Sequence, residues 1–349
     1  MKAWVLHDIG DLRFEEHEDP VPTPGHVVVS VRAAGICGSD IPRIFETGAH
    51  THPLIPGHEF AGEVTETSDE DAKYLGKRVG VFPLIPCMEC SNCRRRKYEL
   101  CSNYNYLGSR CDGGYAQKVL VPTWNLIEVP EKVSFEAAAM IEPAAVAYHA
   151  IRQIPDFKHR LAPLDMPVCV WGLGTIGLLL AAILRGMGYN EIWCVGNKPS
   201  QKKRISELGI DEKYYVDCND SESVSGLTSV GLAAVFECVG RKESYASVID
   251  VAGSSADVVL VGNPRSDMDL PREIYWKILR KQLAVRGTWN SSFGSTDDDW
   301  RCVMAMMAEG SLRPEEFISH RFALKDMMDG LIVMRDRTEE YCKVMINDI

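Results

Sequence analysis

The segment VCVWGLGTIG, residues 168–177, decides the fold of this chain. Four apolar residues typical of a buried strand run directly into the pattern G-x-G-x-x-G, and a helical stretch follows at residues 178–187. In this context the first glycine permits a tight turn, the second lets backbone approach a pyrophosphate, and the third lets the helix pack on the strand. The segment therefore predicts a phosphate-binding strand–turn–helix unit, whose contact positions are Gly172, Gly174, Thr175, Ile176 and Gly177.

The segments that follow continue this pattern. Predicted strands at residues 191–195, 233–239, 257–261 and 283–288 alternate with helical stretches. Such alternation is typical of a parallel sheet with helices on both faces. We therefore predict a doubly wound Rossmann domain over residues 149–289.

The end of its second strand predicts which nucleotide binds. An acidic residue about 20 positions after the glycine motif binds the ribose hydroxyls of NAD. Here the position nineteen after Gly177 is Gly196, followed by Asn197 and Lys198, with further cations at residues 202–204. This uncharged turn favours NADP over NAD, because it does not repel a 2′-phosphate. The alternative is that these cations are only a solvated helix start and that NAD binds.

Four cysteines with the spacing C-x2-C-x2-C-x7-C predict a metal lobe. This compact spacing suits four thiolates around one tetrahedral zinc, whereas disulfides between such near neighbours are strained. All four positions are filled by protein, so this zinc stabilises a loop and leaves no open position for a substrate. The ligands are Cys87, Cys90, Cys93 and Cys101.

A second, open zinc site is indicated by three residues far apart in the sequence. Cys37 follows a β-rich segment, His58 comes twenty-one residues later, and Glu142 is a carboxylate within an apolar helical stretch. Cysteine, histidine and glutamate are zinc ligands, and three of them plus a water or substrate define a catalytic site. From spacing alone, a core cysteine and a packing histidine remain equally open.

The composition excludes several classes of protein. The 349 residues carry 38 basic and 49 acidic side chains, and the net charge of −11 disfavours binding to nucleic acid or an anionic membrane. The N-terminus lacks the apolar core of a signal peptide, and the longest apolar run is too short to span a bilayer. We expect a cytoplasmic globular protein of about two domains that acts on a small molecule.

The ordered motifs together resemble the zinc-dependent medium-chain dehydrogenase/reductase family over nearly the whole chain. Glu142 in place of a cysteine resembles the polyol dehydrogenase branch, and within it the enzymes of galactitol 1-phosphate. The resemblance implies an α/β fold, with a GroES-like β-barrel catalytic domain at residues 1–148 and 290–349 beside the Rossmann domain. It also implies homodimers or homotetramers with two zinc ions per chain, one catalytic on Cys37, His58 and Glu142 and one structural.

The resemblance also implies a reaction, hydride transfer between a nicotinamide cofactor and a secondary alcohol of a polyol phosphate. Ser39, two residues from Cys37, is the expected acceptor of the hydroxyl proton. A relay histidine of the wider family is replaced by Pro42, so the proton is expected to leave by water, a ribose hydroxyl or His50. Asp40 and Glu59 are expected to orient the site, and Glu59 is an alternative ligand to Glu142.

Three further residues are predicted to bind the substrate phosphate. Arginine offers a fixed fork of donors that suits phosphate. The residues are Arg43, His50 and Arg110.

Other functions remain open at this stage. The same zinc and cofactor would serve a dehydrogenase of an unphosphorylated polyol, of the sorbitol type, or of threonine. A non-catalytic nucleotide-binding sensor and a zinc-ribbon nucleic-acid binder are alternatives of other classes, and the acidic charge disfavours the latter.

Overall fold

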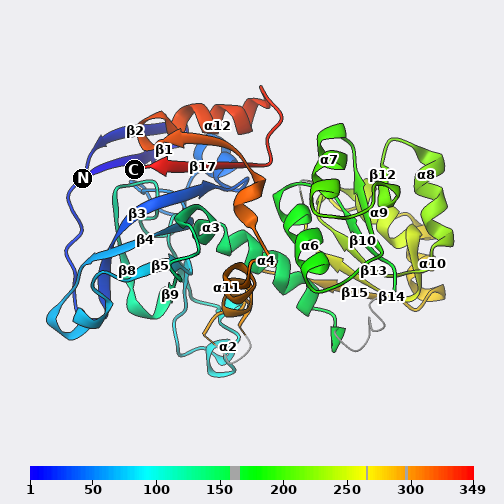
Figure 1. The fold of residues 1–349 in the computed structure, drawn as a ribbon, viewed down its shortest axis with the longest axis horizontal. Coiled ribbons are helices and arrows are strands. Elements are labelled where there is room, and N and C mark those ends of the chain that lie inside the picture. The colour runs from blue at the N-terminus through cyan, green and yellow to red at the C-terminus, as the bar shows by residue number, and fades with distance from the viewer. Residues whose placement is uncertain (158–165, 265, 295–297) are drawn as a thin grey trace. The chain divides into compact units, whose positions relative to one another are not determined.

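A computed structural model describes residues 1–349 except 158–165, 265 and 295–297. The chain forms two compact units. Unit 1 contains Met1–Pro143 and Ser291–Ile349, and unit 2 contains Ala144–Asn290. The first unit is therefore built from both ends of the chain, which Figure 1 shows in blue and red on the same unit.

Unit 1 is built mainly of antiparallel strands. Its largest sheet has the order β16-β17-β3-β4-β5-β9, with β8 also paired to β3, and the short pairs β1–β2 and β6–β7 flank it. The strands are β1 (Lys2–Asp8), β2 (Asp11–Glu16), β3 (His26–Ile36), β4 (Glu59–Glu66), β5 (Arg78–Val81), β6 (Leu84–Ile85), β7 (Asn105–Tyr106), β8 (Lys118–Pro122), β9 (Leu126–Glu128), β16 (Ile318–Ala323) and β17 (Lys343–Asp348).

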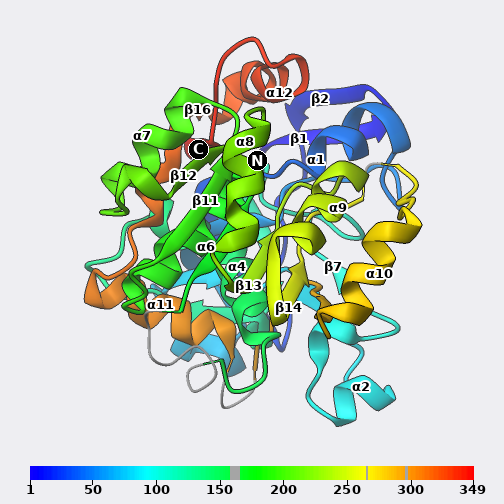
Figure 2. The same ribbon diagram turned by 90° about the vertical axis from the view of Figure 1, so that its right-hand side faces the viewer.

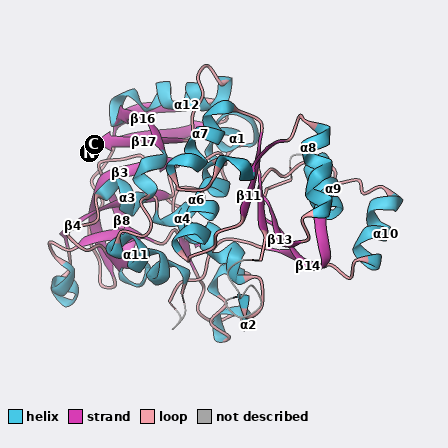
Figure 3. Ribbon diagram, turned by 45° about the vertical axis from the view of Figure 1, so that its right-hand side comes forward, coloured by secondary structure: helices cyan, strands magenta, loops and turns pink. Residues whose placement is uncertain are grey.

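The C-terminal strand completes this sheet. β17 pairs antiparallel with β3 and parallel with β16, as Figure 3 shows in magenta. β16 was not among the strands predicted from the sequence. Val344 and Ile346 are fully buried and join the core that β3 and β4 cover, so burial holds the tail on the sheet.

Helices and aromatic contacts complete unit 1. Phe82 stacks on Phe293 with ring centroids 4.7 Å apart and meets Trp300 edge-on at 5.4 Å, so the later segment is anchored to the earlier one. The described helices are α1 (Asp40–Pro42), the π-helix Arg43–Thr47, α2 (Ser91–Arg94), α3 (Phe135–Ala139), α11 (Asp299–Glu309) and α12 (Met327–Asp336), while α4 (Ile141–Arg152) crosses from unit 1 into unit 2.

Unit 2 is a doubly wound parallel sheet, which confirms the predicted fold class. The strand order is β12-β11-β10-β13-β14-β15, and every neighbouring pair is parallel. The strands are β10 (Val168–Trp171), β11 (Ile192–Gly196), β12 (Tyr215–Asp217), β13 (Leu232–Glu237), β14 (Ala252–Leu260) and β15 (Ala284–Gly287).

Helices cover both faces of this sheet. Figures 1 and 2 show α6 and α7 on one side and α8, α9 and α10 on the other. Their bounds are α6 (Thr175–Gly186), α7 (Pro199–Glu207), α8 (Ser221–Gly226), α9 (Lys242–Val251) and α10 (Arg272–Arg280). The β10 side chains are almost fully buried, because both faces of a parallel sheet are covered.

None of the helices in the described residues combines the length and the apolar character that a membrane span requires.

Candidate metal centres and nucleotide-binding loop

The pairing of β3 with β4 brings Cys37 and His58 together. In this antiparallel pair Gly35 lies opposite Glu59, so the residue after β3 and the residue before β4 are neighbours in space. Among the described residues, ligand atoms of Cys37, His58 and Glu59 all lie within 4.8 Å of one another. A thiolate, an imidazole and a carboxylate at this separation fit one zinc ion.

Glu59 also pairs with a residue that the sequence analysis did not identify. Lys343 of β17 forms a buried ion pair with its carboxylate, and the two side chains are 3% and 2% exposed. A Cβ atom on Gly35 would stand 2.7 Å from Lys343 Cε and collide with Glu59, so glycine makes room for the pair. Burial alone would lower the pKa of Lys343, but Glu59 and Cys37 raise it, so the ammonium stays charged.

Glu142 lies close to these groups but outside the three-residue group of Cys37, His58 and Glu59. Tyr106 Oη donates to Glu142 Oε1 at 3.4 Å. Burial raises the pKa of Glu142 to about 7; His58 opposes the rise and the Glu59 carboxylate adds to it. Two neighbouring buried carboxylates cannot both stay ionised without cations, and a divalent metal would supply that charge.

Asp40 lies next to the Nδ1 atom of the His58 imidazole. Its Oδ1 lies 3.3 Å from His58 Nδ1, while Oδ2 accepts from Tyr115 Oη at 2.6 Å and from the Cys37 backbone at 3.1 Å. Burial alone would raise the pKa of Asp40, but His58 and Arg43 hold it well below its ordinary value. A carboxylate on Nδ1 fixes the imidazole orientation and leaves Nε2 to face a metal.

Ser39 lies beside the candidate metal ligand Cys37. Its hydroxyl donates to Cys37 Sγ at 3.3 Å. The residue predicted to accept the substrate proton therefore lies next to a candidate metal ligand.

The four cysteines of the lobe converge as a tetrahedral site requires. The Sγ atoms of Cys87 and Cys93 and those of Cys90 and Cys101 are each 4.0 Å apart, and those of Cys101 and Cys87 are 3.5 Å apart. Zn–S bonds of about 2.3 Å give edges of nearly 4 Å. All four cysteines are free, so their geometry fits a metal and not disulfides.

Backbone amides of the lobe lower the pKa of one of its thiols. The backbone N–H groups of Cys93 and Ser102 lower the pKa of the Cys90 thiol to about 5, because they stabilise a thiolate. Cys93 N–H also makes the cap of the short helix α2 on Cys90. The amides stabilise a thiolate at Cys90, whereas burial and the neighbouring thiols raise the pKa of Cys93 to about 12, so a bound metal would be needed to keep that sulfur ionised.

The glycine motif has the backbone of a phosphate loop. Gly172 has φ +100°, a conformation that favours glycine, and a Cβ atom on Gly177 would overlap Gly172 O, so α6 packs close to β10. A Cβ atom on Gly174 would meet nothing within 4 Å, so open space lies above this loop. Thr175 begins α6, a twelve-residue helix whose N-terminus faces that space. The loop fits a pyrophosphate.

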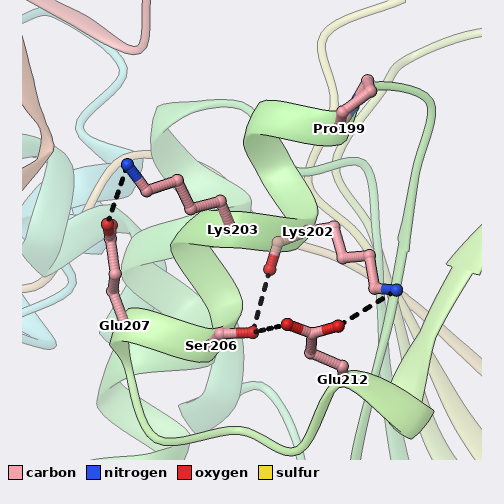
Figure 4. A pocket seen from close by; sticks show the side chains of 6 residues that line it. All are labelled: Pro199, Lys202, Lys203, Ser206, Glu207 and Glu212. Carbon is pink, nitrogen blue, oxygen red and sulfur yellow. Dashed lines mark hydrogen bonds and ion pairs between the residues drawn. The ribbon is translucent and has the colours of Figure 1, made fainter.

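The turn after β11 carries fewer free cations than its sequence suggests. Figure 4 shows Lys202 paired with Glu212 and Lys203 paired with Glu207, at 3.1 and 3.7 Å. In the described part of the chain, Lys198 and Arg204 have no such ion pair. Lys202 and Lys203 are therefore partly neutralised by acidic neighbours, and Lys198 and Arg204 are the cations near Gly196 without such a pair in the described residues.

The three residues predicted to bind phosphate share one electrostatic neighbourhood in unit 1. Burial, and then Arg110 and Arg43, lower the pKa of His50. Arg110 lies over the ring of Tyr104 at 4.6 Å, and its buried Nε has no hydrogen-bond partner within the described residues. Arg43 is engaged by the buried Asp40 at 2.5 Å. Arg110 thus has a buried donor that no hydrogen bond within the described residues uses.

Comparisons with known proteins agree with this geometry. Residues 23–131 match the alcohol dehydrogenase GroES-like domain, and residues 175–309 match the zinc-binding dehydrogenase family. The chain is 31% identical to galactitol 1-phosphate 5-dehydrogenase of Escherichia coli K12 over 330 residues, 92% of each chain. It is also 31% identical to sorbitol dehydrogenase of Halalkalibacterium halodurans over 338 residues, 93% of this chain and 94% of that one.

Solved structures show the same fold. Galactitol-1-phosphate dehydrogenase from Escherichia coli has a TM-score of 0.88 at 29% identity, covering 99% of this chain and 100% of that chain. A zinc-binding dehydrogenase of Sinorhizobium meliloti 1021 bound to NADP has a TM-score of 0.87 at 26% identity, covering 99% and 98%. The predicted family and the GroES-like and Rossmann fold are confirmed. The chain belongs to the zinc-binding alcohol dehydrogenase family and is a medium-chain oxidoreductase.

Proposed function

We propose that this oxidoreductase is a zinc-dependent polyol-phosphate dehydrogenase, of the galactitol 1-phosphate type or acting on a related hexitol or pentitol phosphate. The observation that carries the proposal is the position of Arg110, whose buried Nε has no hydrogen-bond partner among the described residues and belongs to the same cationic neighbourhood as His50 and Arg43. Guanidinium groups bind phosphate strongly, and a free polyol offers nothing that requires them.

The proposed metal ligands are Cys37, His58 and a carboxylate. Glu142 is the proposed third ligand, and Glu59 is its alternative because the structure groups it with the other two. Zinc bound there supplies Lewis acidity toward the substrate oxygen. A second zinc on the four-cysteine lobe would be structural.

The protein's own groups would accept the substrate proton and set the geometry for hydride transfer. When bound, a nicotinamide cofactor would accept a hydride from the alcohol carbon, and the chain's own groups would take the proton from the alcohol oxygen, which balances as a ketone and a reduced cofactor. Ser39 accepts the hydroxyl proton and passes it on to water, a ribose hydroxyl or His50, since Pro42 carries no group that relays protons. Asp40 holds the His58 imidazole in place.

The nucleotide is proposed to bind unit 2, with NADP favoured over NAD. Gly172, Gly174, Thr175, Ile176 and Gly177 would contact the pyrophosphate. Gly196, Asn197 and Lys198 would surround the adenosine ribose without a carboxylate to repel a 2′-phosphate.

A substrate panel tests these assignments. Hexitols, pentitols, their phosphates and threonine are each assayed with NAD and with NADP. We expect the highest kcat/KM for a polyol phosphate with NADP. The alternative, an unphosphorylated polyol or threonine as substrate, draws support from relatives of both kinds with 31% and 27% identity. Preference for either would contradict the phosphate assignment, and no turnover with two zinc ions bound would favour a nucleotide-binding sensor.

We also propose a homodimer formed through unit 2. Tyr275, Trp276 and Leu279 of α10 are 54%, 46% and 49% exposed, although Ile274 and Ile278 of the same helix pack on the core. β15 ends the sheet beside it and pairs with β14 on one side. A second copy could pair along this edge and cover the aromatic face. Trp276→Asp should produce monomers in sedimentation analysis, whereas an unchanged mass would place the contact elsewhere.

A further inference from the structure

Gln201 of α7 joins the two loops of the proposed nucleotide site. Its Nε2 donates to the backbone oxygen of Leu173, within the glycine motif, at 2.9 Å. Its Oε1 accepts from the backbone N–H groups of Asn197 and Lys198 at 2.9 and 3.1 Å. One side chain therefore connects the phosphate loop to the turn that follows β11.

The same carboxamide fills the space beside Gly196. A Cβ atom at this position would lie 2.6 Å from Gln201 Oε1, 3.0 Å from Leu173 Cδ1 and 3.2 Å from the ring of Tyr215. Tyr215 also donates from its hydroxyl to the backbone oxygen of Lys198 at 3.1 Å, which holds the turn from the other side. A side chain at residue 196 fits only if Gln201 moves.

We propose that Gln201 is a specificity-determining residue for the 2′ position of the adenosine ribose. It takes the space of the acidic side chain that binds ribose hydroxyls in NAD-binding domains of this fold. Because the carboxamide is uncharged, it leaves the turn without repulsion toward a 2′-phosphate, and the cations of Lys198 and Arg204 remain to attract one. This inference rests on the proposed nucleotide binding and uses no residue of the zinc centres.

The substitution Gln201→Glu tests the effect of a negative charge at this position, because the two side chains have almost the same shape. The carboxylate still accepts from both backbone N–H groups, but it cannot donate to the Leu173 oxygen and it places a negative charge beside residue 196. Loss of that donor is shared with the Gln201→Met control, so the charge is what distinguishes the two variants. We expect the Kd for NADPH to rise about tenfold or more, while that for NADH stays equal or falls. Both constants are measured by fluorescence titration without substrate, so the result does not depend on turnover.

Gln201→Met is the matched control, because methionine has a similar length but no charge and no hydrogen bonds. We expect the Kd values for NADH and NADPH to rise by the same factor, since only the link between the two loops is lost. Thermal unfolding of each variant shows whether it folds. A ratio of the two Kd values that is unchanged in Gln201→Glu, or that shifts equally in Gln201→Met, would overturn the proposal.

The proposed competition for space between residue 196 and Gln201 is tested by adding an acidic side chain at residue 196. Gly196→Asp alone should gain little NADH affinity, because the new side chain meets Gln201 Oε1. Combined with Gln201→Ala, the same substitution should bind NADH about tenfold more tightly than Gly196→Asp alone. Equal NADH affinity in the two variants would refute the proposed competition for space.

The cofactor preference of the native protein tests the proposed use of NADP separately from the role of Gln201. A native preference for NADH would contradict the proposed use of NADP. The role of Gln201 is decided independently, by the change in cofactor ratio that Gln201→Glu produces.

Discussion

The two candidate metal centres of unit 1 differ in how the chain assembles them. The four cysteines of the lobe lie within residues 87–101, and their sulfur atoms converge around a short helix. The centre at Cys37 and His58 draws on β3, β4 and β17, and Lys343 lies 284 residues from its partner Glu59. A local site can be read from spacing, whereas a site built by sheet pairing cannot.

The difference also lies in what surrounds the ligands. The backbone amides that lower the pKa of Cys90 belong to the lobe itself, and all four of its sulfur atoms come from one short segment. The Cys37 centre concentrates Asp40, Glu59 and Glu142 with Lys343 in a buried space. Each of its charges needs a partner, because an unpaired buried charge is costly. The open centre at Cys37 and His58 therefore depends on contacts between distant segments, whereas the four-cysteine lobe is formed by one short segment.

His58→Ala should give the largest effect. We expect kcat to fall by about 10³-fold or more, because the proposed Lewis acid loses a ligand. Metal analysis should find one zinc per chain instead of two, and the Kd for NADPH should not change. Retained turnover would show that the Cys37 centre is not the reactive site.

Cys93→Ser should act on folding and not on the chemistry. A closed zinc site contributes folding energy, so we expect a loss of about 4 kcal/mol or more in the free energy of unfolding. Chelator treatment of the native protein should reproduce the loss. A variant with full zinc content and native thermal stability would contradict the structural role of the lobe.

Lys343→Met should show how far the open centre depends on a distant strand. The substitution leaves Glu59 buried without its cation, and breaking such a pair costs about 3 kcal/mol of stability. Lys343→Met with Glu59→Gln removes both charges and should recover at least half of the loss. Equal denaturation midpoints for the single and double variants would show that the ion pair is not the cause.

Arg110→Ala should give the smallest effect, confined to the substrate. We expect KM for the phosphorylated polyol to rise about tenfold or more, with KM for its unphosphorylated analogue unchanged. Arg32→Ala is the control, because Arg32 is 48% exposed and pairs with Glu63 on the surface. Arg43→Ala is less informative, since it also removes a partner of the buried Asp40. Equal effects on both substrates would remove Arg110 from the phosphate site.

Most strands of unit 2 were predictable, because buried parallel strands form short apolar runs between helical segments. Five predicted strands correspond to β10, β11, β13, β14 and β15, whereas the three-residue strand β12 was not predicted. β16 was missed, since ISHRFA interleaves polar residues with apolar ones and gives a weak signal for a strand. Its pairing with β17 is a long-range property, which local propensity does not contain.

The sequence by itself determined the family, the parallel sheet and the four-cysteine lobe, because glycine motifs and cysteine spacings act over a few residues. It also singled out Cys37 and His58, through the family resemblance. The sequence also named Glu59, as an alternative ligand to Glu142, and the tertiary structure groups it with Cys37 and His58. Only the tertiary structure brought Lys343 to that carboxylate and set Gln201 against Gly196. Those contacts arise from sheet register and close packing between distant segments, and no local pattern of residues encodes them.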